Sequence, residues 1–227
     1  MKTQSVVSLD PIERGRKHQD GLIGRFFKTR HFGGKRASFP DAFGHYLFVG
    51  KQRMGKTASM VWYFDRMANK YKKKGYKVFV FSNLGIGSPI TCSTLHEKLV
   101  SIEFNPQNVY FFLIDEIQSY FPKDTKNSDI LKKIDALTGD FSQLGKRQIY
   151  VFSTAQVYGR LNKNLREQCL YMVDCRRSFF TRKFVNDFIE GDDVICDELG
   201  RWTGVPKKIY VHGLSSLEYD THRLIVE

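Results

Sequence analysis

The sequence predicts an α/β fold in which helices cover both faces of a mainly parallel central sheet. Two observations predict it. From His45 onward, short apolar runs of strand length alternate with segments of helical period, and a glycine-rich pattern stands between the first strand and the first helix. The chain has 227 residues, which is enough for one domain with a well-buried core. We therefore expect three layers, α/β/α, with ligands gathered at the carboxyl edge of the sheet.

The expected strands and helices follow one another as stacked βα units. The first strand is expected at 46–49 and the helix after it at about 56–74, because one stripe of that segment is apolar at helical spacing. Gly75 ends this helix at its C-terminal cap. The other strands, which complete a core of five, are expected at 77–82, 109–114, 148–154 and 170–174, and connecting helices or partial helices at 129–144 and 159–168.

Both ends of the chain differ from this regular middle part. Residues 1–40 contain nine Lys and Arg against three Asp and Glu, which is half of the net positive charge, and their glycines show little periodicity. We therefore predict a basic N-terminal arm over 1–40 and one domain over 41–227. Within that domain the core is expected at 44–178 and a C-terminal extension at 179–227, with a late β addition at 207–211 and 223–226.

The composition narrows the classes of protein. The net charge of +12 favours a polyanionic partner, either nucleic acid or an anionic membrane surface. The four cysteines are scattered, without the spacing of a zinc site or a disulfide framework. The longest apolar runs are far shorter than the roughly 20 residues of a membrane-spanning helix, and the N-terminus lacks the pattern of a secretory signal. We expect a cytoplasmic protein without a transmembrane segment.

The glycine-rich pattern between the first strand and the first helix is G-x-x-x-x-G-K-[ST], at 50–57. Gly50 and Gly55 allow the backbone to wrap closely around phosphate oxygens, and the helix N-terminus adds its positive dipole end. Lys56 is expected to neutralise the β- and γ-phosphates of ATP, and Thr57 to offer its hydroxyl group to Mg²⁺. A chance match in one chain of this length has a probability on the order of one in a hundred, so the motif predicts a nucleotide site.

Two adjacent carboxylates follow the apolar strand 109–114, which we expect to neighbour the first strand. Asp115 is placed to hold Mg²⁺ through its water shell, and Glu116 to polarise the water that attacks the γ-phosphate. A strand that merely ends in a polar cap is the alternative. Glu116 favours hydrolysis over transfer to a small molecule, because only hydrolysis needs an activated water.

The strand 148–154 is followed by Ala155 and Gln156, and a polar side chain here would face the γ-phosphate from the next position of the sheet. Gln156 is the candidate for this sensor position. Thr154 and Ser153 are alternatives, and an ordinary turn at the end of a strand is a further one.

Four segments together resemble the FtsK–HerA superfamily of DNA-pumping ATPases, which has a RecA-like fold; they are Gly50–Thr57, Ile114–Glu116, Ser153–Gln156 and Leu165–Cys169. Within that superfamily the short chain is similar to the genome-packaging ATPases of tailless viruses with an internal membrane, such as tectiviruses. The segment 114–122 also resembles the zonula-occludens-toxin-like assembly proteins of filamentous phages. Those normally continue into a transmembrane helix, so packaging is expected before extrusion.

This resemblance implies ATP and Mg²⁺ as ligands and a homo-oligomeric ring, with a hexamer expected. In such rings a neighbouring subunit inserts an arginine at the γ-phosphate. Arg166 is favoured by its position relative to Gln156, with Arg147 and Arg160 as alternatives and surface ion pairing as the ordinary fate of an arginine. The implied partners are double-stranded DNA and proteins of the capsid vertex or inner membrane. The implied locations are the host cytoplasm and the packaging vertex of the virion.

Two basic segments and one polar loop could contact DNA. Residues 25–36 interleave cations with aromatic side chains, which suits DNA, a neighbouring subunit or an anionic membrane equally well. The loop 123–129 follows the strand that carries the carboxylates and is better placed to report hydrolysis to a polymer. A further basic patch is formed by Arg176, Arg177, Arg182 and Lys183.

The leading hypothesis from the sequence is an ATP hydrolase that translocates a double-stranded DNA genome into a preformed viral capsid. One alternative is a filamentous-phage-type extrusion ATPase that acts on single-stranded DNA. Another is a DNA-associated structural protein or switch that binds ATP without hydrolysing it.

Overall fold

The computed structural model describes residues 40–178 and 183–213. The strands of the main sheet are β1 (Gly44–Val49), β2 (Lys77–Ser82), β3 (Ser88–Pro89), β4 (Asn108–Ile114), β5 (Ile149–Ala155), β6 (Cys169–Arg177), β7 (Phe184–Glu190) and β10 (Lys208–His212). A separate small hairpin consists of β8 (Ile195–Cys196) and β9 (Trp202–Thr203). The α-helices are α2 (Lys56–Lys73), α3 (Cys92–Val100), α4 (Ser128–Ser142) and α5 (Lys163–Glu167). The single-turn 3-10 helices are η1 (Ile117–Ser119), η2 (Leu144–Arg147), η3 (Tyr158–Arg160) and η4 (Gly191–Asp193).

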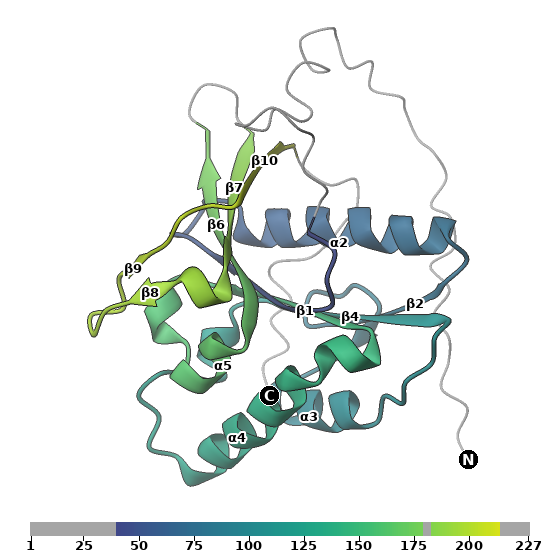
Figure 1. Ribbon diagram of the computed structural model, residues 1–227. Coiled ribbons are helices and arrows are strands. Elements are labelled where there is room, and N and C mark those ends of the chain that lie inside the picture. Colours follow the sequence, from purple (N-terminus) through teal and green to yellow (C-terminus); the bar gives the residue numbers. More distant parts are fainter. Residues whose placement is uncertain (1–39, 179–182, 214–227) are drawn as a thin grey trace, which may run out of the picture.

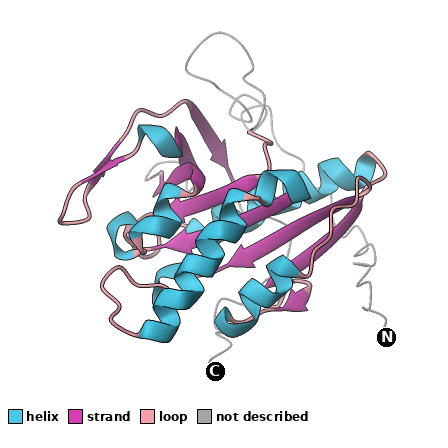
Figure 2. Ribbon diagram, turned by 60° about the horizontal axis from the view of Figure 1, so that its bottom comes forward, coloured by secondary structure: helices cyan, strands magenta, loops and turns pink. Residues whose placement is uncertain are grey.

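The main sheet is mostly parallel, as the sequence predicts. Its strand order within the described residues is β10-β7-β6-β1-β5-β4-β2-β3. All neighbours are parallel from β6 to β3, and β7 and β10 are added antiparallel at the other edge. Helix α2 covers one face, and α3, α4 and α5 cover the other (Figure 1). Figure 2 shows the helices on the face opposite α2 lying over the strands. The three-layer α/β/α architecture is therefore confirmed.

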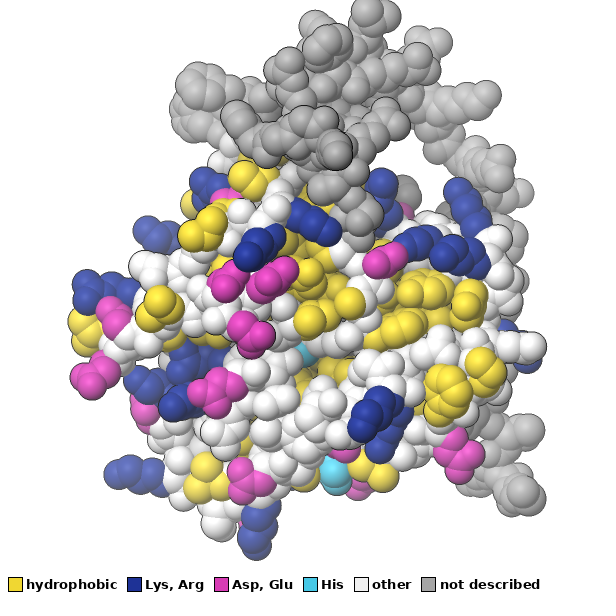
Figure 3. Space-filling view, viewed as in Figure 1, with side chains coloured by type: hydrophobic (Ala, Val, Ile, Leu, Met, Phe, Trp, Pro, Cys, Tyr) yellow, Lys and Arg dark blue, Asp and Glu magenta, His cyan; other side chains and the backbone are white. Residues whose placement is uncertain are grey.

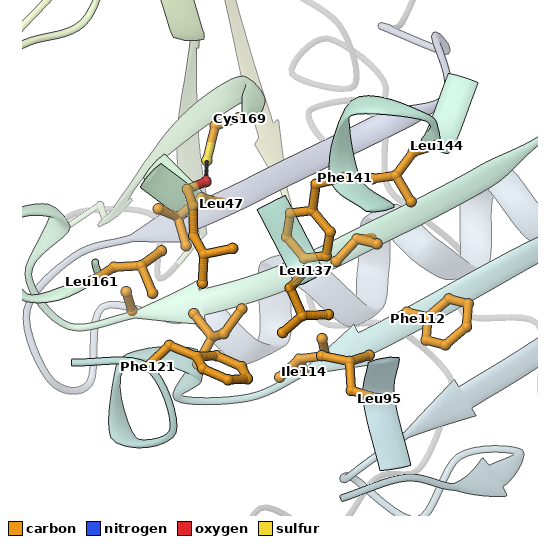
Figure 4. Packing of buried hydrophobic residues seen from close by; sticks show 14 of the residues in the cluster. Leu47, Leu95, Phe112, Ile114, Phe121, Leu137, Phe141, Leu144, Leu161 and Cys169 are labelled. Carbon is orange, nitrogen blue, oxygen red and sulfur yellow. Dashed lines mark hydrogen bonds between the residues drawn. The ribbon is translucent and has the colours of Figure 1, made fainter. Parts of the chain in front are cut away.

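Each face of the sheet has its own apolar core, because successive side chains of a strand point to opposite faces. On the α2 face the core is rich in aromatic residues, such as Tyr46, Tyr150 and Phe152. On the other face, aliphatic residues of β1 and β5 pack with Leu137 and Phe141 of α4 (Figure 4). Burial on both faces explains why these strands read as continuous apolar runs in the sequence.

Most of the expected elements are present, with small shifts. The first helix ends as expected near Gly75, whose φ of 85° is left-handed. The Gly75 N–H donates to Lys72 O at 3.0 Å and the Tyr76 N–H to Tyr71 O at 3.1 Å, which is the Schellman pattern of a helix end. The expected helix 159–168 is instead divided into η3 and α5, because the Asn162 side chain caps a new helix by accepting from the Asn164 N–H at 2.9 Å.

Helix α3 and strand β7 were absent from the sequence prediction, as were the short strands β3, β8 and β9. Helix α3 begins at a capping box in which Thr91 and Thr94 bond reciprocally. Strand β7 is interrupted in its apolar pattern by the buried polar residues Asn186 and Asp187. The expected β addition at 207–211 corresponds to β10, whereas 223–226 and the arm 1–40, apart from Pro40, lie outside the described residues.

The order of the strands corrects one expectation. Strand β4, which ends at the two carboxylates, does not neighbour β1, because β5 lies between them. Strand β1 pairs with β5 on one side and β6 on the other. The carboxyl end of β1 therefore lies between the ends of β5 and β6. Ligands of open α/β sheets bind at the carboxyl ends of the strands.

Among the described residues, no helix combines the length and the apolar character that crossing a bilayer requires. On the face shown in Figure 3, Lys and Arg side chains alternate with Asp and Glu around a band of hydrophobic side chains. The positive charge of the described residues is therefore not gathered into one patch on this face.

Candidate active site

The loop between β1 and α2 depends on two glycines because neighbouring atoms approach its backbone closely. Gly50 has φ 152°, and a Cβ atom there would lie 2.6 Å from the Cys175 carbonyl oxygen. Gly55 has φ 84°, and a Cβ atom there would lie 2.2 Å from a ring carbon of Phe184. Both distances are far below van der Waals contact, so a side chain at either position would displace the loop from strands β6 and β7.

The loop delivers Lys56 and Thr57 to the first turn of α2. The Lys56 side chain is almost entirely buried, and its Nζ lies 3.7 Å from Oε1 of Glu116. The Thr57 hydroxyl donates to Oδ1 of Asp115 at 2.9 Å. The structure therefore brings the two sequence motifs together, although β5 separates their strands.

Asp115 is the centre of a hydrogen-bonded network. Its Oδ1 also accepts a hydrogen bond from the Thr154 hydroxyl at 2.6 Å. Asn83, directly after β2, fixes the Asp115 backbone on both sides, since its Oδ1 accepts from the Asp115 N–H at 2.8 Å and its Nδ2 donates to the Asp115 carbonyl at 3.0 Å. Burial raises the pKa of Asp115, against the lowering effect of hydrogen bonds from Thr154 and Thr57. A cation bound here would favour the charged form.

Glu116 occupies a strained backbone conformation, with φ 53° and ψ 46°. Left-handed angles are uncommon for residues other than glycine, and they cluster at functional sites. The Glu116 N–H donates to Oγ1 of Thr154 at 2.9 Å, so this one hydroxyl group fixes both carboxylate residues. The Glu116 side chain points toward Lys56 through Oε1 and accepts from Nε2 of Gln118 through Oε2.

The three sensor candidates lie in different surroundings. Thr154 contacts both carboxylate residues. Ser153 points to the opposite face of the sheet, where its Oγ lies 2.7 Å from Nε2 of His45. Gln156 lines a cleft of about 820 Å³ that opens beside Glu116. Gln156 thus shares a cleft with Glu116, while Thr154 is the candidate in direct contact with Asp115 and Glu116.

The cleft beside Glu116 is formed by segments that follow β4 and β5, together with the loop between β8 and β9. Its walls include Gln118, Lys123, Arg160 and Leu199. Residues 123–125 of the loop that the sequence singled out line it. The loop therefore lies where a molecule that enters the cleft would touch it.

The three candidate arginines lie in different surroundings. Arg166 donates from Nη1 to Cys196 Sγ at 2.9 Å, and its guanidinium lies 5.1 Å from the ring centre of Tyr158. Arg147 donates to the Leu99 carbonyl at 3.1 Å, near the amino end of β5 and away from the carboxylates. Arg160 is exposed and lines the cleft.

Part of the predicted basic patch is neutralised within the chain. Arg176 forms ion pairs with Asp174 and Asp187. Arg182 lies outside the described residues.

The oxygens of Thr57 and Asp115 are the kind that Mg²⁺ prefers, and they lie within one hydrogen bond of each other. Magnesium in such sites keeps several waters and takes further oxygens from the phosphates, so two protein residues are sufficient. Among the described residues no three His, Cys, Asp or Glu side chains gather as a metal site. The donor set therefore fits a magnesium ion bound together with a nucleotide.

Two residues of this network were missed from the sequence. Asn83 directly follows β2 and Asp115 directly follows β4, and the register pairs Ser82, one residue before Asn83, with Leu113, two residues before Asp115. A polar residue at the end of each parallel strand is a signal that could have identified Asn83. Gln118 has no such signal, because its contact with Glu116 depends on the turn of η1.

No protein-family model matches the chain, and no curated protein matches its sequence. Among solved structures, the N-terminal domain of zonular occludens toxin from Neisseria meningitidis is similar with a TM-score of 0.50 at 20% identity, over 78% of this chain and 96% of that one. The genome-packaging NTPase B204 of Sulfolobus turreted icosahedral virus 2, bound to ATP-gammaS, aligns with a TM-score of 0.45 at 11% identity, over 74% and 99% of the two chains. The chain thus has the RecA-like fold of P-loop NTPases.

Proposed function

We propose that this protein is a magnesium-dependent ATPase that moves DNA. The observation that carries the ATPase proposal is the convergence of the Thr57 and Thr154 hydroxyl groups on Oδ1 of Asp115, beside Lys56 and Glu116. The three residues meet at one edge of the sheet, with Thr57 in α2 after β1, Asp115 after β4 and Thr154 in β5. A buried lysine, a buried carboxylate and a glutamate with a strained backbone each cost stability. Their presence at one place therefore favours a role in binding and hydrolysing a phosphate compound.

Each residue has a role that its position supports. The backbone N–H groups of 50–57 and the Lys56 ammonium would hold the β- and γ-phosphates. Thr57 and Asp115 would hold Mg²⁺, which bridges the phosphates and spreads the negative charge of the transition state. Thr154 keeps Asp115 and Glu116 in position. Asn83 positions the Asp115 backbone.

Glu116 would accept a hydrogen bond from the attacking water and turn its lone pair toward the γ-phosphate. Gln156, on the cleft wall, would contact the γ-phosphate or that water as the sensor.

Arg166 is the residue that the sequence favours as the arginine inserted at the γ-phosphate of a neighbouring subunit. In this chain, however, its guanidinium is held by Cys196 and Tyr158. Arg160 is exposed on the cleft and is therefore the better-supported candidate.

We propose that the polymer moved is double-stranded DNA, which is packaged into a preformed viral capsid. The packaging motor would be a homo-oligomeric ring of the FtsK–HerA type, with a hexamer expected. The net charge of +12 supports a polyanionic client. The arm 1–40 and the loop 123–129 are the proposed contact segments, with capsid-vertex or inner-membrane proteins as partners. The proposed locations are the host cytoplasm and the packaging vertex.

A second candidate is extrusion of single-stranded DNA during assembly of a filamentous phage. The likeness of the fold to the N-terminal domain of zonular occludens toxin favours it. The two candidates share the ATPase site and differ in the form of DNA, so one assay addresses both.

The test is ATP turnover by the purified protein without DNA, with double-stranded DNA and with single-stranded DNA, each at low and high salt. We expect Mg²⁺-dependent turnover that double-stranded DNA stimulates and that salt suppresses, because phosphate contacts release counterions. Stimulation by single-stranded DNA alone would favour extrusion. Lys56→Ala should abolish turnover, whereas Lys133→Ala, which removes an exposed lysine of α4, should not. If the protein hydrolyses no ATP under any of these conditions, the proposal is wrong.

A further inference from the structure

The large apolar side chains that are exposed among the described residues gather at two places. At the first place they belong to the hairpin β8–β9 and to the segments beside it: Val157, Ile195, Leu199 and Val205. At the second place they stand at the end of α3 and just beyond it: Val100 and Phe104. Leu131 of α4 is the exception. Scattered apolar side chains are ordinary on a protein surface, whereas grouped ones mark a contact surface.

The first place, which we call the hairpin surface, combines projecting apolar side chains with negative charge. Leu199, in the turn between β8 and β9, is 77% exposed, and Ile195 of β8 is 73% exposed. Residues 190–207 contain five Asp and Glu against two Lys and Arg, in a chain whose net charge is +12. The hairpin surface is therefore acidic where the chain as a whole is basic.

The second place is a groove at the amino ends of β2 and β4, on the face of the sheet that α3 covers. It has a volume of about 310 Å³, and its lining includes Phe79, Phe81, Phe104 and Tyr110. The Phe79 ring is stacked on the Tyr110 ring with 5.1 Å between the ring centres. Within the described residues, β2 pairs on its outer side only with the two residues of β3. This edge of the sheet is therefore open to another chain.

Positive charge borders the groove. Lys98 of α3 lines it, and Lys77 points to the same face of β2 as Phe79, because alternate residues of a strand share a face. Three further exposed lysines, at 72–74, end α2 just before β2. Glu103 is the one acidic residue in the lining of the groove. The groove and its border therefore carry the charge opposite to that of the hairpin surface.

The two surfaces complement each other but lie at opposite ends of β4. The groove contains Asn108, the first residue of β4, whereas Leu199 lines the cleft with Glu116, two residues after the end of β4. In Figure 1 the hairpin β8–β9 lies at the left and β2 at the right. The surfaces of one chain therefore do not meet each other. Two different surfaces that match on copies of one molecule form a head-to-tail contact, which repeats from copy to copy.

We propose that the hairpin surface of one copy of this chain docks in the groove of the next copy. The inference rests on the proposed function, which expects a homo-oligomeric ring, and it names the two surfaces that join the copies. Apolar side chains at the centre and charged side chains around them are the ordinary anatomy of a protein interface. Because Leu199 lines the cleft beside Glu116, the docked copy lies beside that cleft.

The test measures the association of the full chain by sedimentation, with Mg²⁺ and a slowly hydrolysed ATP analogue. Leu199→Ser and Phe104→Ser each change one exposed side chain, one on each surface. Each should weaken association at least about tenfold, as expected when an apolar anchor of an interface is removed. The matched control is Leu131→Ser, an exposed apolar residue outside both surfaces, which should associate as the wild type does.

A mixture of the two variants tests the head-to-tail arrangement itself. Leu199→Ser keeps its groove and Phe104→Ser keeps its hairpin surface, so the mixture should form dimers with one copy of each variant and nothing larger. These dimers should appear at concentrations where either variant alone is monomeric. A contact of one surface with itself would instead leave one of the two variants unaffected.

The inference is wrong if the wild-type chain stays monomeric, if either variant associates as the wild type does, or if the mixture forms no dimers. It is also wrong if Leu131→Ser weakens association equally, or if Phe104→Ser loses binding to DNA without losing association. Thermal unfolding checks that the variants are folded, and Leu199→Ala and Phe104→Ala replace any that is not. Sedimentation does not depend on hydrolysis, so a monomer that hydrolyses ATP contradicts this inference alone, and an oligomer without turnover contradicts only the proposed function.

Discussion

Polar networks lie at both ends of strands β1 and β5. The network at the amino end joins tyrosine hydroxyls to backbone carbonyls, whereas the network at the carboxyl end includes charged side chains. At the amino end, tyrosine hydroxyls donate to backbone carbonyls: Tyr46 to Ala42 at 2.7 Å, and Tyr63 and Tyr150 to Pro40 and Asp41. No charged side chain takes part in these three bonds. The rings also pack together, with Phe111 stacked on Tyr150 at 4.9 Å. This network fixes the chain where it enters the domain.

At the carboxyl end, ionisable groups are buried, and Arg53 and Glu116 have a positive φ. Lys56 and Asp115 are less than a tenth exposed, Glu116 has left-handed angles, and Gln118 has an unpartnered oxygen. Such features cost stability. At the amino end the three tyrosine bonds involve no charged group, although Gln148 before β5 also has a φ of 57° and His45 is buried there. We infer that the network at the amino end serves stability, whereas the network at the carboxyl end holds groups ready to react. Changes at the two ends should therefore separate activity from stability.

The largest expected effect is on turnover at the carboxyl end. Glu116→Gln should lower kcat about 10²- to 10⁴-fold, because the amide cannot act as a base, while nucleotide affinity is kept. Turnover and binding of a fluorescent ATP analogue measure the two quantities. A variant that retains more than about a tenth of wild-type kcat would rule Glu116 out as the base.

Thr154→Val should affect both activity and stability. It removes the donor to Asp115 and leaves the Glu116 N–H unpaired, which costs about 1–3 kcal/mol of unfolding free energy. Because both carboxylate residues lose a fixed position, kcat should fall about 10- to 100-fold. Ser153→Ala is the matched control, since that hydroxyl faces His45 on the other side of the sheet. Its kcat should remain that of the wild type, and an equal loss in both variants would contradict the assignment.

Acid should weaken the fold through a histidine at the amino end of β1. Burial lowers the pKa of His45 to about 3, so the unfolded chain binds a proton there below about pH 6.5 and the folded chain does not. Stability is therefore full above pH 6.5 and falls as the pH decreases toward 3. From pH 7.5 to 5.5 this one group should remove about 1–2 kcal/mol, as measured by urea unfolding.

His45→Gln isolates that contribution, because the raised pKa values of buried carboxylates such as Asp115 act in the opposite direction. The variant should be less stable at pH 7.5 and should show a smaller decrease on acidification. A decrease equal to that of the wild type would show that His45 does not carry this pH dependence.

The smallest effect is expected from Tyr150→Phe. It removes a hydroxyl that donates to the Asp41 carbonyl and lies 3.0 Å from the Tyr71 hydroxyl, but it keeps the stacked ring. Unfolding free energy should fall about 0.5–1.5 kcal/mol, with kcat unchanged. A large loss of turnover would mean that the two networks are coupled across β5.

The sequence by itself determined the features that depend on neighbouring residues. Gly50, Gly55, Lys56 and Thr57 are recognisable because the glycines, the cation and the hydroxyl must follow one another between a strand and a helix. Asp115 and Glu116 are recognisable because carboxylates directly follow an apolar strand. The alternation of strands and helices likewise predicted the α/β class, since its periods are local.

Only the tertiary structure decided how these pieces meet. The insertion of β5 between β1 and β4 places Thr154 against Asp115, and the register of β2 on β4 brings Asn83 to the Asp115 backbone. The same structure holds Arg166 against Cys196 and leaves Arg160 on the cleft. Strand order and register depend on contacts between segments far apart in the chain, and no local pattern of residues specifies them.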